Sequence, residues 1–172
     1  MSTRIAGLVD ASALRELAAS TFALACPPGT SQAEIDNHIA TELSLERFEL
    51  YLADPAREIR VAGDFLGYTM LVFGEPTDPD VLAAITVRPT VELSKCYLRL
   101  EAHGTGLAAE LMEATIASAR QHGASALWLG VSQQKGRANR FYEKNGFERV
   151  GIKYFRVGEE LHNDFVRQLD LR

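Results

Sequence analysis

The chain has little cysteine and no long hydrophobic segment, and these two scarcities exclude several classes of protein. Only two of its 172 residues are cysteines, Cys26 and Cys96, and they do not form a Cys-x-x-Cys pair. This spacing predicts neither a disulfide framework nor a zinc site. No apolar run approaches the roughly 20 residues of a membrane-spanning helix, and the N-terminus lacks the basic and then apolar order of a signal peptide. We therefore expect a reduced, cytoplasmic protein with no metal and no membrane partner.

An excess of positive charge is also missing. The formal net charge is -5, which argues against nucleic acid as the main partner and is compatible with a cationic substrate. Hydrophobic residues make up 47% and charged residues 24% of the chain, as in an ordinary soluble globular protein. The length predicts a single domain over residues 1–172 with a sizeable core.

The hydrophobic periodicity of the first half predicts helices followed by a hairpin. Asp10 or Ser12 is expected to cap the first helix, and Thr30 or Ser31 the second. A polar loop, 74–80, should lead through 81–87 to the central strand. The predicted elements are a strand at 3–9, helices at 10–25, 32–43 and 45–53, and hairpin strands at 58–62 and 65–73 joined across Gly63-Asp64.

The second half alternates between strand and helix patterns and therefore predicts parallel neighbours joined by helical crossovers. Hairpins at each end of the chain imply antiparallel neighbours as well. The fold class is α/β, with one mixed sheet and helices on both faces, and ligands of such sheets bind at the carboxyl ends of strands. The predicted elements are strands at 92–100, 126–131, 147–156 and 162–169, helices at 107–121 and 137–144, and a last turn at Gly158.

One stretch of this half, 98–108, has the composition of an anion site. An apolar strand passes through two glycines, Gly104 and Gly106, directly into a helix. The first N–H groups of a helix have no partner inside the helix, and the helix dipole adds partial positive charge there. The stretch lacks the lysine of a P-loop and the third glycine of a dinucleotide fingerprint. An ordinary strand-to-helix turn is the alternative interpretation.

A second motif lies about thirty residues further on. Residues 137–147 predict a short helix that stops at Asn145-Gly146. Phe141 and Phe147 are expected to anchor it in the core. Tyr142 lies beside them and carries a phenolic hydroxyl, which needs a partner when it is buried.

Together the two motifs resemble the GCN5-related N-acetyltransferase (GNAT) family. The acetyl-CoA signature of that family, Arg/Gln-x-x-Gly-x-Gly/Ala, corresponds to Glu101-Ala102-His103-Gly104-Thr105-Gly106. The resemblance extends from about Glu92 to the C-terminus, and the ending is most similar to bacterial members related to the polyamine acetyltransferase branch. The family pattern Ala-x-x-Phe-Tyr-Glu-Lys-x-Gly-Phe is matched by Ala138, Phe141, Tyr142, Glu143, Lys144, Gly146 and Phe147.

The resemblance implies a sheet of about seven strands that splays between the fourth and fifth, here 92–100 and 126–131. The pantetheine arm of acetyl-CoA would pair in that gap with the backbone of Leu98 and Leu100. Tyr142 would be the general acid that protonates the departing thiolate, and the N–H of Leu98 would stabilise the carbonyl oxygen during direct attack by an amine. The pyrophosphate would rest on the amides of His103, Gly104, Thr105, Gly106, Leu107 and Ala108.

Two residues depart from the family pattern. Glu101 replaces the usual arginine or glutamine and is expected to face solvent, and His103 should contribute its amide while its ring lies near solvent. Lys135 stands where many relatives have an asparagine that contacts the CoA arm. Asn139 could substitute for that asparagine, or it could be an ordinary surface residue. We therefore expect the loop to bind through its main chain.

The general base is the least certain assignment. Glu92 is the first candidate, acting through water from the start of the central strand, and Glu42 and Glu46 are the alternatives. Each of these carboxylates could equally be an ordinary solvated charge. Trp128 and Cys96 are expected to be core residues. His38, His122 and His162 do not have the spacing of metal ligands.

The resulting hypothesis is an acetyl-CoA-dependent N-acetyltransferase that acts on a primary amine, either a polyamine or another small cationic amine. The acceptor could instead be a peptide or protein N-terminus, an amino acid or an aminoglycoside-like compound. A catalytically weak acetyl-CoA-binding or interaction protein is a further alternative. Base rates favour a homodimer.

Overall fold

The computed structural model describes residues 2–157 and 160–172, so the turn predicted at Gly158 lies outside the described residues. Internal contacts divide the chain into two compact units. The first consists of residues 1–72 and 95–117, and the second of residues 73–94 and 118–172. Strand β4 (Thr90–Leu98) and helix α5 (Leu107–Gln121) each contribute residues to both units. The single domain expected from the chain length stays a prediction.

The strands of the first unit begin with an antiparallel meander. β1 (Thr3–Ile5) pairs with β2 (Arg57–Ala62), which pairs with β3 (Gly67–Val72). The strand predicted at 3–9 is too long, because Leu8–Asp10 form a 3₁₀ turn. The hairpin loop is longer than the predicted dipeptide and spans residues 63–66.

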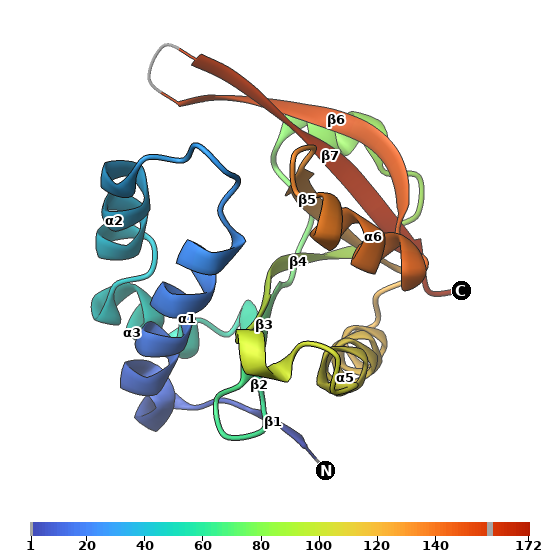
Figure 1. The fold of residues 1–172 in the computed structure, drawn as a ribbon. Coiled ribbons are helices and arrows are strands. Elements are labelled where there is room, and N and C mark those ends of the chain that lie inside the picture. The colour runs from blue at the N-terminus through green and yellow to red at the C-terminus, as the bar shows by residue number, and fades with distance from the viewer. Residues whose placement is uncertain (1, 158–159) are drawn as a thin grey trace. The chain divides into compact units, whose positions relative to one another are not determined.

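Three helices of the first unit, α1 (Ala11–Ala25), α2 (Gln32–Thr41) and α3 (Leu45–Ala53), precede β2 and are blue to teal in Figure 1. The predicted cap at Ser31 is confirmed, since its hydroxyl accepts a hydrogen bond from Glu34 N at 3.1 Å. The core of this unit joins apolar side chains of α1 and α3 to β2 and β3, including Leu17, Phe48 and Tyr68.

The start of α1 differs from the capping arrangement that the sequence predicts. Asp10 is the N-cap residue, but its carboxylate makes no capping hydrogen bond. It instead accepts two hydrogen bonds from Arg4, at 2.9 and 3.0 Å, and one from Gly7 N at 2.8 Å. A bidentate arginine pair makes two charge-assisted hydrogen bonds where a cap makes one, which explains why Asp10 binds Arg4. This pair lowers the pKa of the Asp10 carboxyl below its ordinary value.

The second unit contains the parallel part of the sheet. β4 pairs in parallel with β5 (Ala126–Ser132), with Glu92 opposite Trp128. β5 pairs antiparallel with β7 (Glu160–Asp170), and β7 with β6 (Glu148–Val157). The strand order β1-β2-β3-β4-β5-β7-β6 makes one seven-stranded mixed sheet. The predicted α/β class and the mixed sheet are confirmed.

Helices cover both faces of the sheet in the second unit. Consecutive residues of a strand point to opposite faces. On β7, Gln168 bonds to the backbone N–H of Thr86 (2.9 Å), just after α4 (Pro79–Ala84). Its neighbour Arg167 bonds to Asn139 of α6 (Gly136–Lys144) at 2.9 Å. In Figure 1, α4 (green) and α6 (orange) accordingly flank the long β6–β7 hairpin.

Helix α4 begins inside the segment that the sequence predicts as a polar loop, 74–80, and is absent from the predicted elements. Asp78 caps it by accepting from Asp80 N at 2.8 Å, and Pro79 is its first residue. An aspartate followed by proline is a recognised helix start, so the signal was present.

Among the described residues, no helix is long and apolar enough to cross a membrane.

The packing of α4 on β6 leaves no room for a side chain at Gly151. A β-carbon built there lies 2.5 Å from Ala84 Cβ. We expect Gly151→Ala to lower the free energy of unfolding by about 1–3 kcal/mol, the usual cost of overpacking, measured by chemical denaturation. Gly7→Ala is the control, because nothing lies within 4 Å of its β-carbon. Equal stability of the two variants would contradict the predicted packing.

Candidate active site

The first part of the site is the end of β4. Arg99 N donates to Leu66 O at 2.7 Å, toward β3. Because neighbouring residues of a strand direct their backbone groups to opposite sides, the N–H and C=O of Leu98 point away from β3. The strand ends at Leu98, and Leu100 lies in a 3₁₀ turn (Leu100–Ala102) rather than in the strand. The expectation that Leu100 offers strand backbone is therefore wrong: its carbonyl accepts from His103 N at 3.1 Å.

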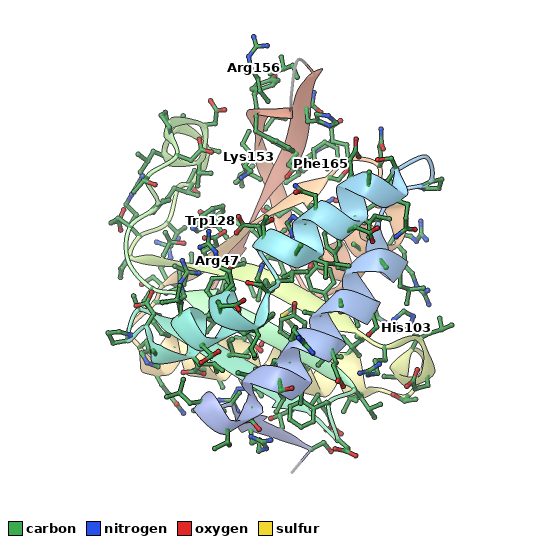
Figure 2. All side chains as sticks on the ribbon, turned by 90° about the vertical axis from the view of Figure 1, so that its left-hand side faces the viewer. Arg47, His103, Trp128, Lys153, Arg156 and Phe165 are labelled. Carbon is green, nitrogen blue, oxygen red and sulfur yellow. The ribbon has the colours of Figure 1, made fainter. Side chains whose placement is uncertain are left out.

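The His103 ring folds back onto β4, which corrects the expectation of a ring near solvent. His103 is labelled in Figure 2, and its Nε2 lies 3.3 Å from Leu98 O. Because a carbonyl only accepts hydrogen bonds, Nε2 is the donor in this contact. The other ring nitrogen, Nδ1, is buried and has no partner among residues 2–157 and 160–172. The ring therefore holds the carbonyl of Leu98 at the point where the loop begins.

The loop itself uses only half of its amides internally. His103 N donates to Leu100 O, Thr105 N to Ala102 O at 3.3 Å, and Leu107 N to Thr105 Oγ1 at 3.3 Å. In the described part of the chain, no acceptor faces the other three N–H groups of the loop, which belong to Gly104, Gly106 and Ala108. The predicted row of six amides is thus reduced to these three.

The two glycines of the loop are required by backbone conformation and not by crowding. Gly104 and Gly106 have φ values of 77° and 86°, and a β-carbon on either would meet nothing within 4 Å. Residues with a β-carbon rarely adopt this left-handed region. The loop leads into the 15 residues of α5, whose dipole adds positive potential at its start. Glu101 is exposed, as expected, and leaves this positive end uncovered.

A second region with candidate site residues, in the other unit, is the turn between β5 and α6, which Asn139 holds. Asn139 is 8% exposed, and its Nδ2 donates to Ser132 O at 3.0 Å and to Lys135 O at 2.9 Å. Its Oδ1 accepts from Arg167 Nε at 2.9 Å. Every polar atom of the side chain is occupied within this unit, so the geometry does not support Asn139 as a CoA contact. It positions the helix instead.

Arg167 is the residue of this region that sequence reasoning missed. Its residue surface is 3% exposed, yet its guanidinium has several acceptors. Besides Asn139, it donates to Phe147 O at 3.1 Å and to Glu143 Oε1 at 3.2 Å. A buried charge is tolerated only when it is hydrogen-bonded in this way. An arginine between Val166 and Gln168, inside the strand predicted at 162–169, was the available signal.

Tyr142 lies on the helix that this network holds. Its ring makes edge contacts with Phe141 and Phe147, with centroid distances of 5.7 and 5.8 Å. The predicted helix stop is confirmed: α6 ends at Lys144, and Gly146 has a φ of 90°. Phe147 N then donates back to Tyr142 O at 2.9 Å. Phe147 is buried, as expected of a core anchor, whereas Phe141 is only half-buried.

The candidate bases occupy different environments. Glu92 is half-buried on β4 in register with Trp128, which is 5% exposed and part of the core as expected. Glu42 lies 3.7 Å from Arg47 in an exposed ion pair, and Glu46 is an exposed residue in the first turn of α3. Surface pairs of this kind contribute little. Of the three, Glu92 is the one placed on a sheet face.

The histidines and cysteines have structural surroundings. Neither Cys26 nor Cys96 forms a disulfide. Within residues 2–157 and 160–172, no group of three His, Cys, Asp or Glu side chains could hold a metal ion. The three remaining histidines each stack on a phenylalanine: His38 on Phe22, His122 on Phe73 and His162 on Phe155.

The Asn139 network predicts a measurable loss of stability. Asn139→Leu removes an acceptor from the buried Arg167 and leaves two carbonyls without their donor. We expect it to lower the free energy of unfolding by about 2–4 kcal/mol, measured by urea denaturation. Asn163→Leu, at an exposed position of β7, is the control and should change stability by about 0.5 kcal/mol or less. Equal losses in both variants would refute the network's importance.

Comparison with known proteins agrees with this geometry. The family model described as the acetyltransferase (GNAT) family matches residues 12–147. An uncharacterized N-acetyltransferase of Mycobacterium tuberculosis is 42% identical over 167 residues, which cover 95% of this chain and 99% of that protein.

Two solved structures share the fold. The PaiA N-acetyltransferase of Thermoplasma acidophilum in complex with coenzyme A has a TM-score of 0.75 at 20% identity, over 99% of each chain. YncA of Salmonella typhimurium with its cofactor acetyl-CoA has a TM-score of 0.63 at 22% identity, over 100% of this chain and 94% of that one. With the family model and the mycobacterial relative, these likenesses establish that the chain belongs to the GNAT family of acetyl-CoA-dependent N-acetyltransferases.

Proposed function

We propose that this enzyme transfers the acetyl group of acetyl-CoA directly to a small primary amine, and that the loop before α5 binds the pyrophosphate. The observation that carries the proposal is the set of amides at Gly104, Gly106 and Ala108, which face no acceptor in the described part of the chain. Amides at a helix N-terminus are a ready site for phosphate oxygens. Because Glu101 is exposed, binding depends on the main chain and not on a cationic side chain.

The backbone of Leu98 is the proposed partner of the pantetheine arm. Its N–H and C=O point away from β3, as an added strand requires. The His103 ring already engages the carbonyl, which leaves the N–H of Leu98 as the group available to the thioester oxygen. A hydrogen bond to that oxygen strengthens as negative charge develops on it during attack by the amine.

Tyr142 is the proposed general acid. The amine nitrogen forms a bond to the acetyl carbon, the C–S bond breaks, and the thiolate takes the phenolic proton. The new amide nitrogen then loses its extra proton, which returns through water to the phenolate. A phenol has an ordinary pKa of about 10 and is protonated at neutral pH, so it can donate this proton. The edge contacts with Phe141 and Phe147 restrict the ring and support a fixed position for the donor.

Glu92 is the proposed base, acting through water. An ammonium acceptor must lose one proton before its nitrogen can attack, and a carboxylate can receive it. Glu92 is half-buried and lies on the same sheet face as Trp128. Glu42 and Glu46 are less suited, because Glu42, just after α2, is paired with Arg47 and Glu46 is exposed on α3.

Three finer expectations stay predictions: a polyamine as the acceptor, a cytoplasmic location and a homodimer. The oligomeric state can be measured by size-exclusion chromatography with light scattering.

Binding of acetyl-CoA provides the first test of the proposal. We expect the wild-type protein to be stabilised by about 2.7 kcal/mol when acetyl-CoA is present at a hundred times its Kd, seen as a thermal shift. Gly106→Ala places a β-carbon at a left-handed φ, which costs about 1–2 kcal/mol whenever the loop adopts the binding conformation. Its affinity for acetyl-CoA should fall by about five- to thirtyfold.

Gly123→Ala is the matched control for this variant. Gly123 has nearly the same φ, 85° against 86°, and its β-carbon would also meet nothing within 4 Å. In the free Gly106→Ala protein the exposed loop can relax to another backbone conformation, so its strain is incurred on binding and lowers the affinity. Gly123→Ala should lower the stability without ligand and leave the affinity unchanged. Absence of any shift in the wild-type protein would refute the proposed cofactor.

The role of Tyr142 can be tested by removing its hydroxyl. Tyr142→Phe should lower kcat by about a hundredfold or more, the typical contribution of a general acid, with little change in the Kd of acetyl-CoA. Steady-state release of CoA and isothermal titration measure the two quantities. Tyr154→Phe, at an exposed position on β6, is the control. Unchanged turnover in Tyr142→Phe would show that another group protonates the thiolate.

A further inference from the structure

The end of β4 is held by more hydrogen bonds than strand pairing alone would supply. Arg99 follows the last strand residue, Leu98, and its backbone N–H donates to Leu66 O at 2.7 Å. Its side chain adds two hydrogen bonds, from Nε to Phe65 O at 3.0 Å and from Nη1 to Ser20 Oγ at 3.2 Å. One residue thus ties the strand end to helix α1 and to the loop of the β2–β3 hairpin.

Phe65 accepts the side-chain hydrogen bond of Arg99 from an uncommon backbone conformation. Its φ is 53°, the only positive value of a non-glycine residue in the described part of the chain. A residue with a β-carbon keeps this left-handed conformation only where the surrounding structure fixes it, and such conformations cluster at functional sites. Here it is fixed by Arg99, by the Arg4 guanidinium 5.6 Å from the ring centroid and by packing against the core of the first unit.

The opposite face of the strand end is closely packed. Neighbouring side chains of an extended chain point to opposite faces, so the side chain of Leu98 lies on the face away from that of Arg99. A β-carbon on Gly67 would lie 2.8 Å from Leu98 Cγ and 3.0 Å from Tyr97 O. Only a glycine permits an approach this close. Leu98 is therefore held on both faces of the sheet.

The pyrophosphate loop, in contrast, is closed by hydrogen bonds of its own. His103 N donates to Leu100 O at 3.1 Å, and Thr105 Oγ1 donates to Ala102 O at 2.5 Å. Each of these bonds joins residues three positions apart in the chain, so the loop keeps its shape when the strand end moves. The contacts of Arg99 and Gly67 therefore act on Leu98 more than on the loop amides.

We infer that Arg99 and Gly67 are positioning residues for acetyl transfer, which together fix the N–H of Leu98 against the thioester oxygen. A donor stabilises the charge that develops on this oxygen only when it is already aligned. A misplacement of about 1 Å can lower the rate by about a hundredfold. Arg99 acts through its bonds to the hairpin and α1, and Gly67 acts by lacking a β-carbon. The inference rests on the transfer reaction and the role of Leu98 proposed above.

Removing the guanidinium tests the role of Arg99. Arg99→Met keeps much of the side-chain length and loses both side-chain hydrogen bonds. We expect kcat to fall by about tenfold or more, while the Kd of acetyl-CoA changes by less than about threefold. Release of CoA with the best acceptor among spermidine, L-amino acids and short peptides gives kcat, and isothermal titration gives the Kd. Arg99→Lys retains a donor and should recover part of the rate.

Arg57→Met is the matched control for Arg99→Met. Arg57 is a half-buried arginine of β2 in the same unit, and it donates to Asp54 at 3.2 Å and contacts the Tyr51 ring. Its replacement should lower stability and leave kcat unchanged. A kcat that falls equally in both variants, or in neither, overturns the inference.

Gly67→Ala displaces Leu98 from the other face. The added β-carbon meets the backbone oxygen of Tyr97 as well as the Leu98 side chain, so the strand end has to shift. We expect a lower kcat with a nearly unchanged Kd of acetyl-CoA. Gly151→Ala, which overpacks the contact with α4, should lower stability and leave kcat nearly unchanged. A normal kcat in Gly67→Ala overturns the role of Gly67.

Amide hydrogen exchange tests the positioning without any substrate. In the protein without ligand, protection of the amide at position 99 should fall by about tenfold or more in Arg99→Met and stay unchanged in Arg57→Met. Unchanged protection, or lost protection with a normal kcat, overturns the inference and leaves the proposed function intact. A wild-type protein that shows neither acetyl transfer nor a thermal shift by acetyl-CoA refutes the proposed function, and the positioning role with it.

Discussion

The buried guanidinium of Arg167 is the constraint on which the arrangement of the second unit depends. A charge at this depth is costly unless acceptors surround it, and the acceptors come from Asn139, Glu143 and the carbonyl of Phe147. The Glu143 side chain is 64% exposed, so its ion pair is weakened by solvent. The two neutral acceptors therefore matter more. Asn139 lies in the middle of α6 and Phe147 lies just after its end. The hydrogen bonds from Arg167 to both residues therefore fix the position of the helix that carries Tyr142.

Sequence patterns predicted the elements well wherever local signals and tertiary packing agree. The bounds of α5 were predicted without error, and β5 and α6 within one residue, because their apolar periodicity and the Asn145-Gly146 stop point to the same structure. The family motifs likewise located the loop before α5 and the helix of Tyr142. Helix α4 shows the opposite case: its Asp78-Pro79 start was legible, but six residues are too few to display a helical period.

The errors within the site concern side chains whose direction is decided by a distant partner. Asn139 was taken as a possible CoA contact, yet its oxygen is bound by Arg167, 28 positions later in the chain. The ring of His103 was expected near solvent, but the carbonyl of Leu98 draws it back onto β4. Asp10 likewise binds Arg4 instead of capping α1. Periodicity describes which face a residue occupies, and it carries no information about which of several acceptors a polar group will choose.

Glycine has two different structural roles in this enzyme. At Gly104 and Gly106 the absence of a β-carbon permits a left-handed backbone. In the described part of the chain, this backbone leaves loop amides without acceptors. At Gly130 and Gly151 the absence of a β-carbon leaves room for a neighbouring side chain. At Gly151 the space is occupied by Ala84, and this packing contributes stability. At Gly130 the space is occupied only by the flexible side chain of Lys153. The same amino acid thus seals one row of the sheet at α4 and leaves it accessible one strand pair away.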